Sequence, residues 1–324
     1  MDRQWRICGL GDYANYYSYF TYGVMEGSIL NGAWFRPIPL FGQPLQAVRE
    51  QILFFKPHAV LAHMIFNKQG QHSMEDVFTL LSDLRRKGIR VIYHAGDARE
   101  VPRWPYDISG IVDFALANHG LRKEYSKAWN VPCYHWPYAC LQQNGILERK
   151  HVSEEYRSLV TFTGSLTASV NHVHAERTRF VEALQKRISI KCFPTPETGN
   201  TRFQTAEVAA GAEAVLGVGM AEHIPEYIDV RPFQYIGAGA AYFHNHSYVM
   251  SKFFLDGFHF IGYEKNNVED FLYKFHNEEH RAKVRVQGFK FAQRYHSTKA
   301  RMRMVLDLLE GKTPQPIYID QVEA

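Results

Sequence analysis

The chain has 324 residues, 46% of them hydrophobic and 22% charged, which is typical of a globular protein large enough for two domains. These values exclude a disordered chain, and neither a membrane span nor a signal peptide is recognisable, so we expect a cytoplasmic protein. Residues 1–150 hold 17 Lys and Arg against 13 Asp and Glu, whereas residues 151–324 hold 20 of each. The net charge of +4 therefore lies in the first half, which indicates an anionic partner there or ordinary variation of surface charge.

The first half alternates apolar strands with helices, beginning with a strand over residues 6–11. Gly9, Gly11 and Ala14 match the GxGxxA pattern of dinucleotide-binding turns. The next strand ends without the acidic residue of that fingerprint, because it carries Arg36. We therefore interpret the glycines as a tight turn that lines a cleft, with NAD binding as the alternative. The further elements expected are helices over 13–25, 43–55, 73–87 and 121–129, and strands over 34–39, 59–63, 89–94, 111–117 and 131–135.

A second alternating series follows a polar segment, residues 139–157, that we interpret as an interdomain linker. Its strands are expected over 159–163, 188–193, 214–218, 240–243 and 258–263. Its helices are expected around 176–184, within the stretch 227–243, and over 268–275, 278–295 and 297–309. Alternation of this kind predicts parallel sheets, which bind ligands beyond the carboxyl ends of their strands.

The stretch from Tyr227 to Phe243 predicts a loop that opens a short helix, with Arg231 and Gln234 near its start and Gly237 and Gly239 behind them. Unpaired N–H groups and the dipole at a helix start favour an anion, and an arginine adds a planar donor fork suited to a diphosphate. The alternative is that Arg231 pairs with a neighbouring carboxylate of the protein itself.

Taken in order, these pieces resemble the GT-B glycosyltransferases. Within that class the chain is similar to the group-1 glycosyltransferases of the spore-coat-maturation type and to bacteriophage DNA beta-glucosyltransferases. The resemblance rests on an ordered set of short motifs: Asp97-Ala-Arg99, Phe162-Thr-Gly-Ser165, Arg231-Pro-Phe-Gln234 with Gly237-Ala-Gly239, and Gly288 with Tyr295-His-Ser297 and Arg301. It implies an α/β protein with two Rossmann-like domains facing each other across a cleft. We place them at residues 1–140 for the acceptor and 158–295 for the nucleotide-sugar, with a closing helix and tail at 296–324 that packs back on the first domain.

The resemblance assigns the acceptor side to the first domain. Asp97 matches the acid that serves as general base on the acceptor hydroxyl, which an inverting transfer requires. Arg99 is implied beside it, and Tyr13 is a candidate for stacking on the acceptor. The alternative for Asp97 is a helix cap. Gly11 is expected to line the cleft on the donor side.

The donor side is implied in the second half. Gly164 and Ser165 match a turn that brings backbone N–H groups to the donor phosphates, with Arg177 or Arg179 supplying charge. Arg231 matches the arginine that neutralises the leaving diphosphate. Gln234 stands where the family has a glutamate that binds the ribose, and a glutamine loses the charge-assisted bond.

We therefore predict an inverting glycosyltransferase with a UDP-sugar donor, UDP-glucose first, and no required cofactor or metal. The His172/His174 and His244/His246 pairs lack the spacing of helical zinc ligands. The leading acceptor is a 5-hydroxymethylpyrimidine in phage-type double-stranded DNA, which would place the protein in the cytoplasm of a bacterial host. A saccharide, protein or small-molecule acceptor is the alternative. Two readings of other classes stay open, an NAD-dependent oxidoreductase and a non-catalytic nucleotide-binding protein.

Overall fold

A computed structural model of the chain describes residues 4–11, 19–63, 72–95, 107–164, 166, 172–193, 202–219, 224–314 and 318–319. They form two compact units, each built on a parallel sheet with helices on its faces, which confirms the predicted α/β class. Unit 1 comprises residues 1–137, 224–227 and 301–314, and unit 2 comprises residues 138–223, 228–300 and 315–324. Within the described ranges, no helix combines the length and the apolar character that crossing a membrane requires.

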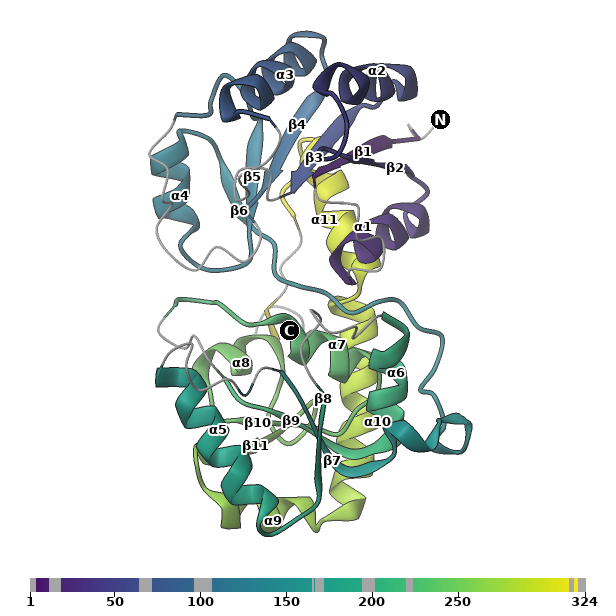
Figure 1. Cartoon of the computed structure of the whole chain (residues 1–324), viewed down its shortest axis with the longest axis vertical. Coiled ribbons are helices and arrows are strands. Elements are labelled where there is room, and N and C mark those ends of the chain that lie inside the picture. Colours follow the sequence, from purple (N-terminus) through teal and green to yellow (C-terminus); the bar gives the residue numbers. More distant parts are fainter. Residues whose placement is uncertain are drawn as a thin grey trace. The chain divides into compact units, whose positions relative to one another are not determined.

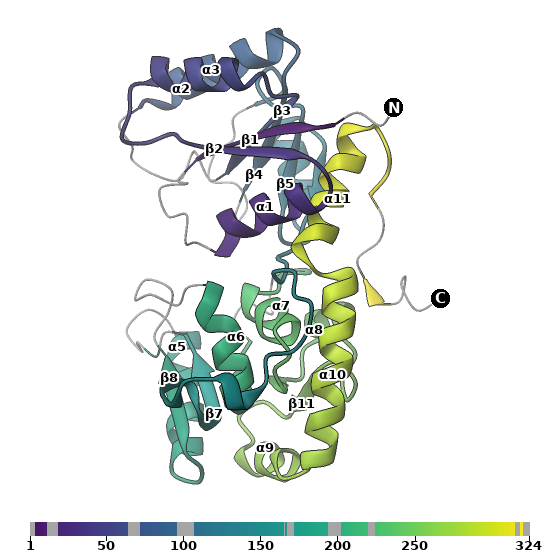
Figure 2. The ribbon, with the colours of Figure 1, turned by 90° about the vertical axis from the view of Figure 1, so that its right-hand side faces the viewer.

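Unit 1 has a six-stranded sheet in the order β2-β1-β3-β4-β5-β6 (Figure 1). The strands are β1 (Arg6–Gly11), β2 (Trp34–Pro39), β3 (Ala59–His63), β4 (Arg90–His94), β5 (Phe114–Ala117) and β6 (Cys133–His135). The helices of this unit are α1 (Tyr19–Leu30), α2 (Leu45–Phe55), α3 (Met74–Arg86), α4 (Arg122–Trp129) and, from the far end of the chain, α11 (Thr298–Leu309). The core on one sheet face joins buried residues of α2, α3 and α4 to alternate strand residues, while α1 and α11 lie on the other side of the sheet (Figure 2).

Local sequence explains where the helices of unit 1 begin and end. Ser73 caps α3 by accepting from the Asp76 N–H at 3.1 Å, as predicted, and Gly88 takes a positive φ just after the helix. Helix α2 begins two residues later than predicted because Pro44, with an extended backbone, precedes its first turn.

Unit 2 has a five-stranded sheet in the order β11-β10-β9-β7-β8. The strands are β7 (Ser158–Thr163), β8 (Ile190–Phe193), β9 (Ala212–Gly217), β10 (Tyr242–Asn245) and β11 (Ile261–Tyr263). The helices are α5 (His172–Gln185), α6 (Arg202–Gly211), α7 (Val230–Gly237), α8 (Tyr248–Phe253), α9 (Val268–Phe275) and α10 (Glu278–Tyr295), and two short 3-10 turns, η1 (Arg149–His151) and η2 (Glu154–Tyr156), precede β7. Helices α5 and α9 pack on one sheet face, and α6 and α7 contact the other.

Two helices of unit 2 were not anticipated. The run of good helix formers in residues 202–211 forms α6, where no helix was predicted. Helix α8 has only six residues and depends on Ser247, whose hydroxyl accepts from Met250 N–H. The strand predicted over residues 258–263 is also shorter, beginning at Ile261.

The segment predicted as a linker is part of unit 2. A Cβ on Gly237 would overlap Cys140, and one on Gly239, which has φ +82°, would lie 2.7 Å from Ile146. The two glycines behind Arg231 therefore let residues 140–146 pack against the end of α7. Their role in the fold is close packing of the backbone.

Candidate functional site

The strand order of unit 2 defines one position where a ligand is expected. From β7 the chain goes to β8 on one side, and then to β9 on the other, so the direction of winding reverses between β7 and β9. Loops diverge at such a switch point and leave a crevice beyond the carboxyl ends of the strands. Thr163 and Gly164 lie at this end of β7, and Gly217 ends β9.

Gly164 is the centre of this region. Its φ of +142° is unfavourable for any residue with a side chain, and a Cβ would lie 2.9 Å from Arg231 Nη1 and 3.6 Å from Arg177 Nη1. Two guanidinium groups, from α7 and α5, therefore approach the backbone of one glycine. The structure brings together three of the residues that the sequence indicated for a donor phosphate.

Arg231 lies in the first turn of α7 and is held by the end of β7 and by the helix cap. Its Nη1 donates to the Thr163 carbonyl at 3.0 Å, and its Nε donates to Asp229 Oδ1 at 3.2 Å. A second arm joins Nη2 to Asp229 Oδ2, while Asp229 Oδ1 also accepts from the Arg231 N–H at 2.8 Å as the helix cap. Burial disfavours ionisation of Asp229, but the charge and hydrogen bonds of Arg231 outweigh it, so the pKa of Asp229 is lower than usual. The carboxylate pairing that the sequence left as an alternative is thus present.

The structure distinguishes the two arginines of α5. Arg177 is 2% exposed and its guanidinium lies 5.8 Å from the centre of the Phe162 ring, beneath Gly164. Arg179, two positions further along the helix, is exposed. Only Arg177 is therefore placed at the switch point.

Several polar residues of this edge were not singled out from the sequence. Tyr242 is buried, its hydroxyl lies where a Cβ of Gly217 would be, and burial raises its pKa well above the usual value. Asn245, at the end of β10, accepts from the Gly219 N–H at 2.7 Å and so orders the loop after β9. Thr163 Oγ1 is buried and has no hydrogen-bond partner among the described residues. The signal available in the sequence was the acidic cap Asp229, which directly precedes α7 and lies two residues before Arg231.

Gln234 and Glu226, a carboxylate eight residues before it in the sequence, lie in different surroundings. Gln234 is half-buried on α7, three residues after Arg231 and therefore on the same side of the helix. Glu226 belongs to unit 1, where it forms an ion pair with Arg122 and lies 3.9 Å from His135 Nδ1. Glu226 therefore has a structural partner of its own.

The carboxyl edge of the unit 1 sheet carries a group of buried polar side chains. At the ends of β3 and β4, His63 Nδ1 and His94 Nδ1 are 2.8 Å apart, so one must donate and the other accept. Burial lowers the pKa of His63 to about 3 and that of His94 well below its usual value. Asn118, just after β5, is fully buried, and neither its Oδ1 nor its Nδ2 has a hydrogen-bond partner within the described ranges.

Gly11 lies at the switch point of unit 1, between β1 and β3, where a Cβ would be 2.5 Å from the His63 carbonyl. This close approach of the backbone explains why residue 11 is a glycine, and no bound nucleotide is needed to explain it. Four other predicted site residues lie outside the described residues: Tyr13, Asp97, Arg99 and Ser165. In the part of the chain that is described, no three His, Cys, Asp or Glu side chains gather as a metal site would require.

Comparison with known proteins gives a partial family match and a likeness of fold. Residues 172–307 match a family model described as glycosyl transferase-like. T4 phage BGT, solved with its UDP-glucose substrate, superimposes with a TM-score of 0.61 at 10% identity over 94% of this chain and 99% of that one. HepE from Anabaena, solved with UDP and glucose, superimposes with a TM-score of 0.58 at 8% identity, over 95% of this chain and 100% of that one.

The sucrose-phosphate synthase of Thermosynechococcus elongatus gives a TM-score of 0.56 at 8% identity, over 95% of this chain and 99% of that one. No curated protein matches the sequence. At identities of 8 to 10% the likeness to solved structures is one of fold.

Proposed function

We propose that the chain, which has the GT-B fold that its sequence predicted, is a glycosyltransferase that transfers a sugar from a UDP-sugar to a hydroxyl acceptor with inversion. The observation that supports the donor site is the approach of Arg177 and Arg231 to Gly164 at the switch point of unit 2. Two guanidinium groups, the backbone of a glycine turn and the start of α7 suit a diphosphate better than a neutral ligand.

The proposed role of these groups is to stabilise the leaving nucleotide. As the glycosidic bond breaks, negative charge develops on the β-phosphate, and fixed cations near that oxygen lower the barrier. Arg231 is already held by Thr163 and Asp229, so it needs little reorganisation to do this. The Thr163 hydroxyl, which is buried beside Gly164 and has no hydrogen-bond partner among the described residues, is a further donor for a phosphate oxygen.

The choice of a uridine nucleotide, with UDP-glucose first, is supported by the ligands of two proteins of similar fold: HepE was solved with UDP and glucose, and T4 phage BGT with UDP-glucose. Gln234, on the same side of α7 as Arg231, is the proposed ribose contact. A glutamine accepts a hydrogen bond from a hydroxyl but lacks the charge of a glutamate, so we expect weaker nucleotide binding than a glutamate would give. The proposal involves no metal ion.

For the acceptor we propose a 5-hydroxymethylpyrimidine in double-stranded DNA, with Asp97 as general base and Arg99 and Tyr13 as acceptor contacts. The support is the Asp97-Ala-Arg99 motif, the excess positive charge of the first half and the likeness in fold to T4 phage BGT. A base acted on by an enzyme must leave the helical stack, and binding to DNA weakens steeply with salt.

The donor proposal is tested by measuring UDP binding calorimetrically with two variants of one helix. Arg177→Ala removes the buried cation beneath Gly164, and Arg179→Ala removes an exposed cation two positions away. We expect at least a tenfold loss of UDP affinity, about 1.4 kcal/mol, for Arg177→Ala and no change for Arg179→Ala. Equal affinities in both folded variants would contradict the site.

The acceptor proposal is tested by incubating the protein with radiolabelled UDP-glucose and duplex DNA with or without 5-hydroxymethylcytosine. We expect label in the modified DNA only, with loss of transfer but retention of UDP binding in Asp97→Asn. Transfer to a saccharide or protein, with none to modified DNA, would contradict the proposed DNA acceptor but would not contradict the proposed donor site.

A further inference from the structure

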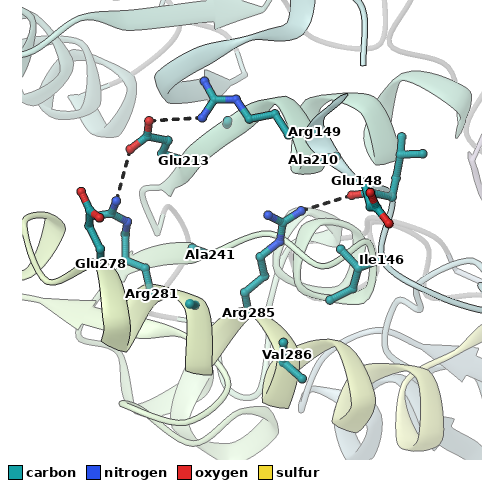
Figure 3. Close-up of a pocket in the computed structure, with 13 residues that line it drawn as sticks. Ile146, Glu148, Arg149, Ala210, Glu213, Ala241, Glu278, Arg281, Arg285 and Val286 are labelled. Carbon is teal, nitrogen blue, oxygen red and sulfur yellow. Dashed lines mark hydrogen bonds and ion pairs between the residues drawn. The ribbon is translucent and has the colours of Figure 1, made fainter. Parts of the chain in front are cut away.

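We propose that a second pocket in unit 2, unrelated to the donor site, binds a small organic anion, that is, a carboxylate or phosphate carried on an apolar group. The pocket has a volume of about 630 Å³ and lies at the amino-terminal ends of the strands, since Ala212 begins β9 and Ala241 directly precedes β10. The donor site lies at the opposite, carboxyl ends of the same strands. Figure 3 shows the arginines that surround the pocket.

Arg285, on α10, is the central cation of this pocket (Figure 3). Its Nε donates to the Gly239 carbonyl and its Nη2 to the Leu147 carbonyl at 3.4 Å. Both partners are neutral, and no carboxylate among the described residues lies within ion-pair distance of this guanidinium. Burial, and secondarily the charge of Arg149, lower the pKa of Arg285. A half-buried cation without a counter-ion, next to a like charge, favours binding of an anion.

Arg281 forms the adjoining wall and is only 7% exposed. Glu213 bridges it to Arg149, with both distances 3.2 Å, so that one carboxylate is shared by two guanidinium groups. The Arg281 Cζ lies over the Phe275 ring, 4.5 Å from its centre, and Arg281 Nη1 is buried without a hydrogen-bond partner in the described part of the chain. Two acidic residues lie at the rim of the pocket. Glu148 forms an ion pair with Lys150, and Glu278 lies beside Arg281 (Figure 3).

The rest of the lining indicates the apolar part of the ligand. Ala210, Ala212, Ala241 and Ala282 leave space where larger side chains would fill the pocket. Ile146, Leu147 and Val286 add apolar surface, and Val286 is 44% exposed. Pockets of this volume accommodate ligands the size of a substituted ring, with a few polar groups fixing the orientation. An oxyanion on Arg285 and Arg149 with an apolar group over the alanines satisfies both features.

The test is calorimetric titration with phenyl phosphate and benzoate, with benzyl alcohol and inorganic phosphate as probes that lack one of the two parts. We expect at least one aromatic anion to bind saturably, with an affinity at least tenfold higher than that of benzyl alcohol or inorganic phosphate. Failure of both aromatic anions to bind the wild-type protein would overturn the proposal.

Matched variants on α10 assign the binding to this pocket. Arg285→Gln should weaken the aromatic anion at least tenfold, whereas Arg294→Gln, the same change at an exposed position outside the pocket, should not. If Arg285→Gln does not fold, Ala282→Glu places a carboxylate at the exposed rim, and Gln287→Glu adds the same charge away from it. Binding that persists in Arg285→Gln or Ala282→Glu, or that is lost in Arg231→Ala instead, would contradict the assignment.

Discussion

Arg231 and Asp229 are joined by a two-armed ion pair within one turn of α7, and the same carboxylate caps the helix. The arginine proposed to neutralise the leaving diphosphate therefore shares its charge with a half-buried neighbour. Asp229 holds Arg231 in place and at the same time reduces the positive field that a diphosphate would meet.

Removing the charge of Asp229 while keeping its cap should separate these two effects. In Asp229→Asn the side-chain oxygen still accepts from the Arg231 N–H, but the ion pair is lost. We expect the free energy of unfolding to fall by about 1 to 3 kcal/mol and UDP to bind more tightly at low salt. Chemical denaturation and calorimetry measure the two quantities. Weaker UDP binding at unchanged stability would show that Asp229 itself contacts the ligand.

Gly164→Ala should disturb the donor site through Arg231. The new methyl carbon would lie 2.9 Å from Arg231 Nη1, and the residue would keep an unfavourable positive φ. We expect UDP affinity to fall at least tenfold, together with a loss of about 1 to 3 kcal/mol in stability. Gly42→Ala is the matched control, because Gly42 also has a positive φ, +82°, but open space around it. It should lose stability only.

Asn118 should be replaceable by an apolar residue without loss of stability. Its amide is fully buried and without a partner in the described residues, so Asn118→Leu removes a desolvation penalty of about 1 to 3 kcal/mol. Asn245→Leu should instead destabilise the protein by a similar amount, because the Gly219 N–H loses its acceptor. Denaturant unfolding of both variants gives the comparison. A destabilised Asn118→Leu would mean that its amide is paired.

Acid should weaken the protein through the His63–His94 pair. The pKa of His63 is about 3 in the folded protein and about 6.5 in an unfolded chain, so the unfolded state binds the additional proton. Stability is then complete above pH 6.5 and declines as the pH falls toward 3, by at most about 1.4 kcal/mol per pH unit for each proton. His63→Gln should reduce this slope, so that its difference from wild type shrinks between pH 7.5 and pH 4.5. A constant difference across that range would exclude the pair as the source.

Several elements could be predicted because the signal for each is local. The start of α7, the Ser73 cap of α3 and the strand that ends at Thr163 depend on a few adjacent residues, and the structure confirms them. The partner of Arg231 was left open, because a carboxylate two residues away and a bound phosphate satisfy a guanidinium equally well. The choice between Arg177 and Arg179 depended on which face of α5 packs on Phe162, which no pattern in the helix itself reveals.

Other features depend on contacts between distant parts of the chain. The interpretation of residues 139–157 as a linker failed to anticipate that Cys140 and Ile146 pack on Gly237 and Gly239. The anion pocket combines residues from η1, β9 and α10, which are far apart in the sequence. Spacing and composition carry no information on such groupings, because they arise only when the sheet has formed.

Helix α11 has a consequence for the order of events during synthesis. Its buried side chains, among them Val305 and Leu306, belong to unit 1, where Trp136 Nε1 donates to the Arg301 carbonyl at 3.0 Å and Trp5 Nε1 to Glu310 at 3.3 Å. A ribosome makes the first strands of unit 1 long before this helix, whereas the sheet of unit 2 is complete by β11. The sheet of unit 2 can therefore form before unit 1 is complete, and the earliest residues of the chain must wait for nearly the last ones.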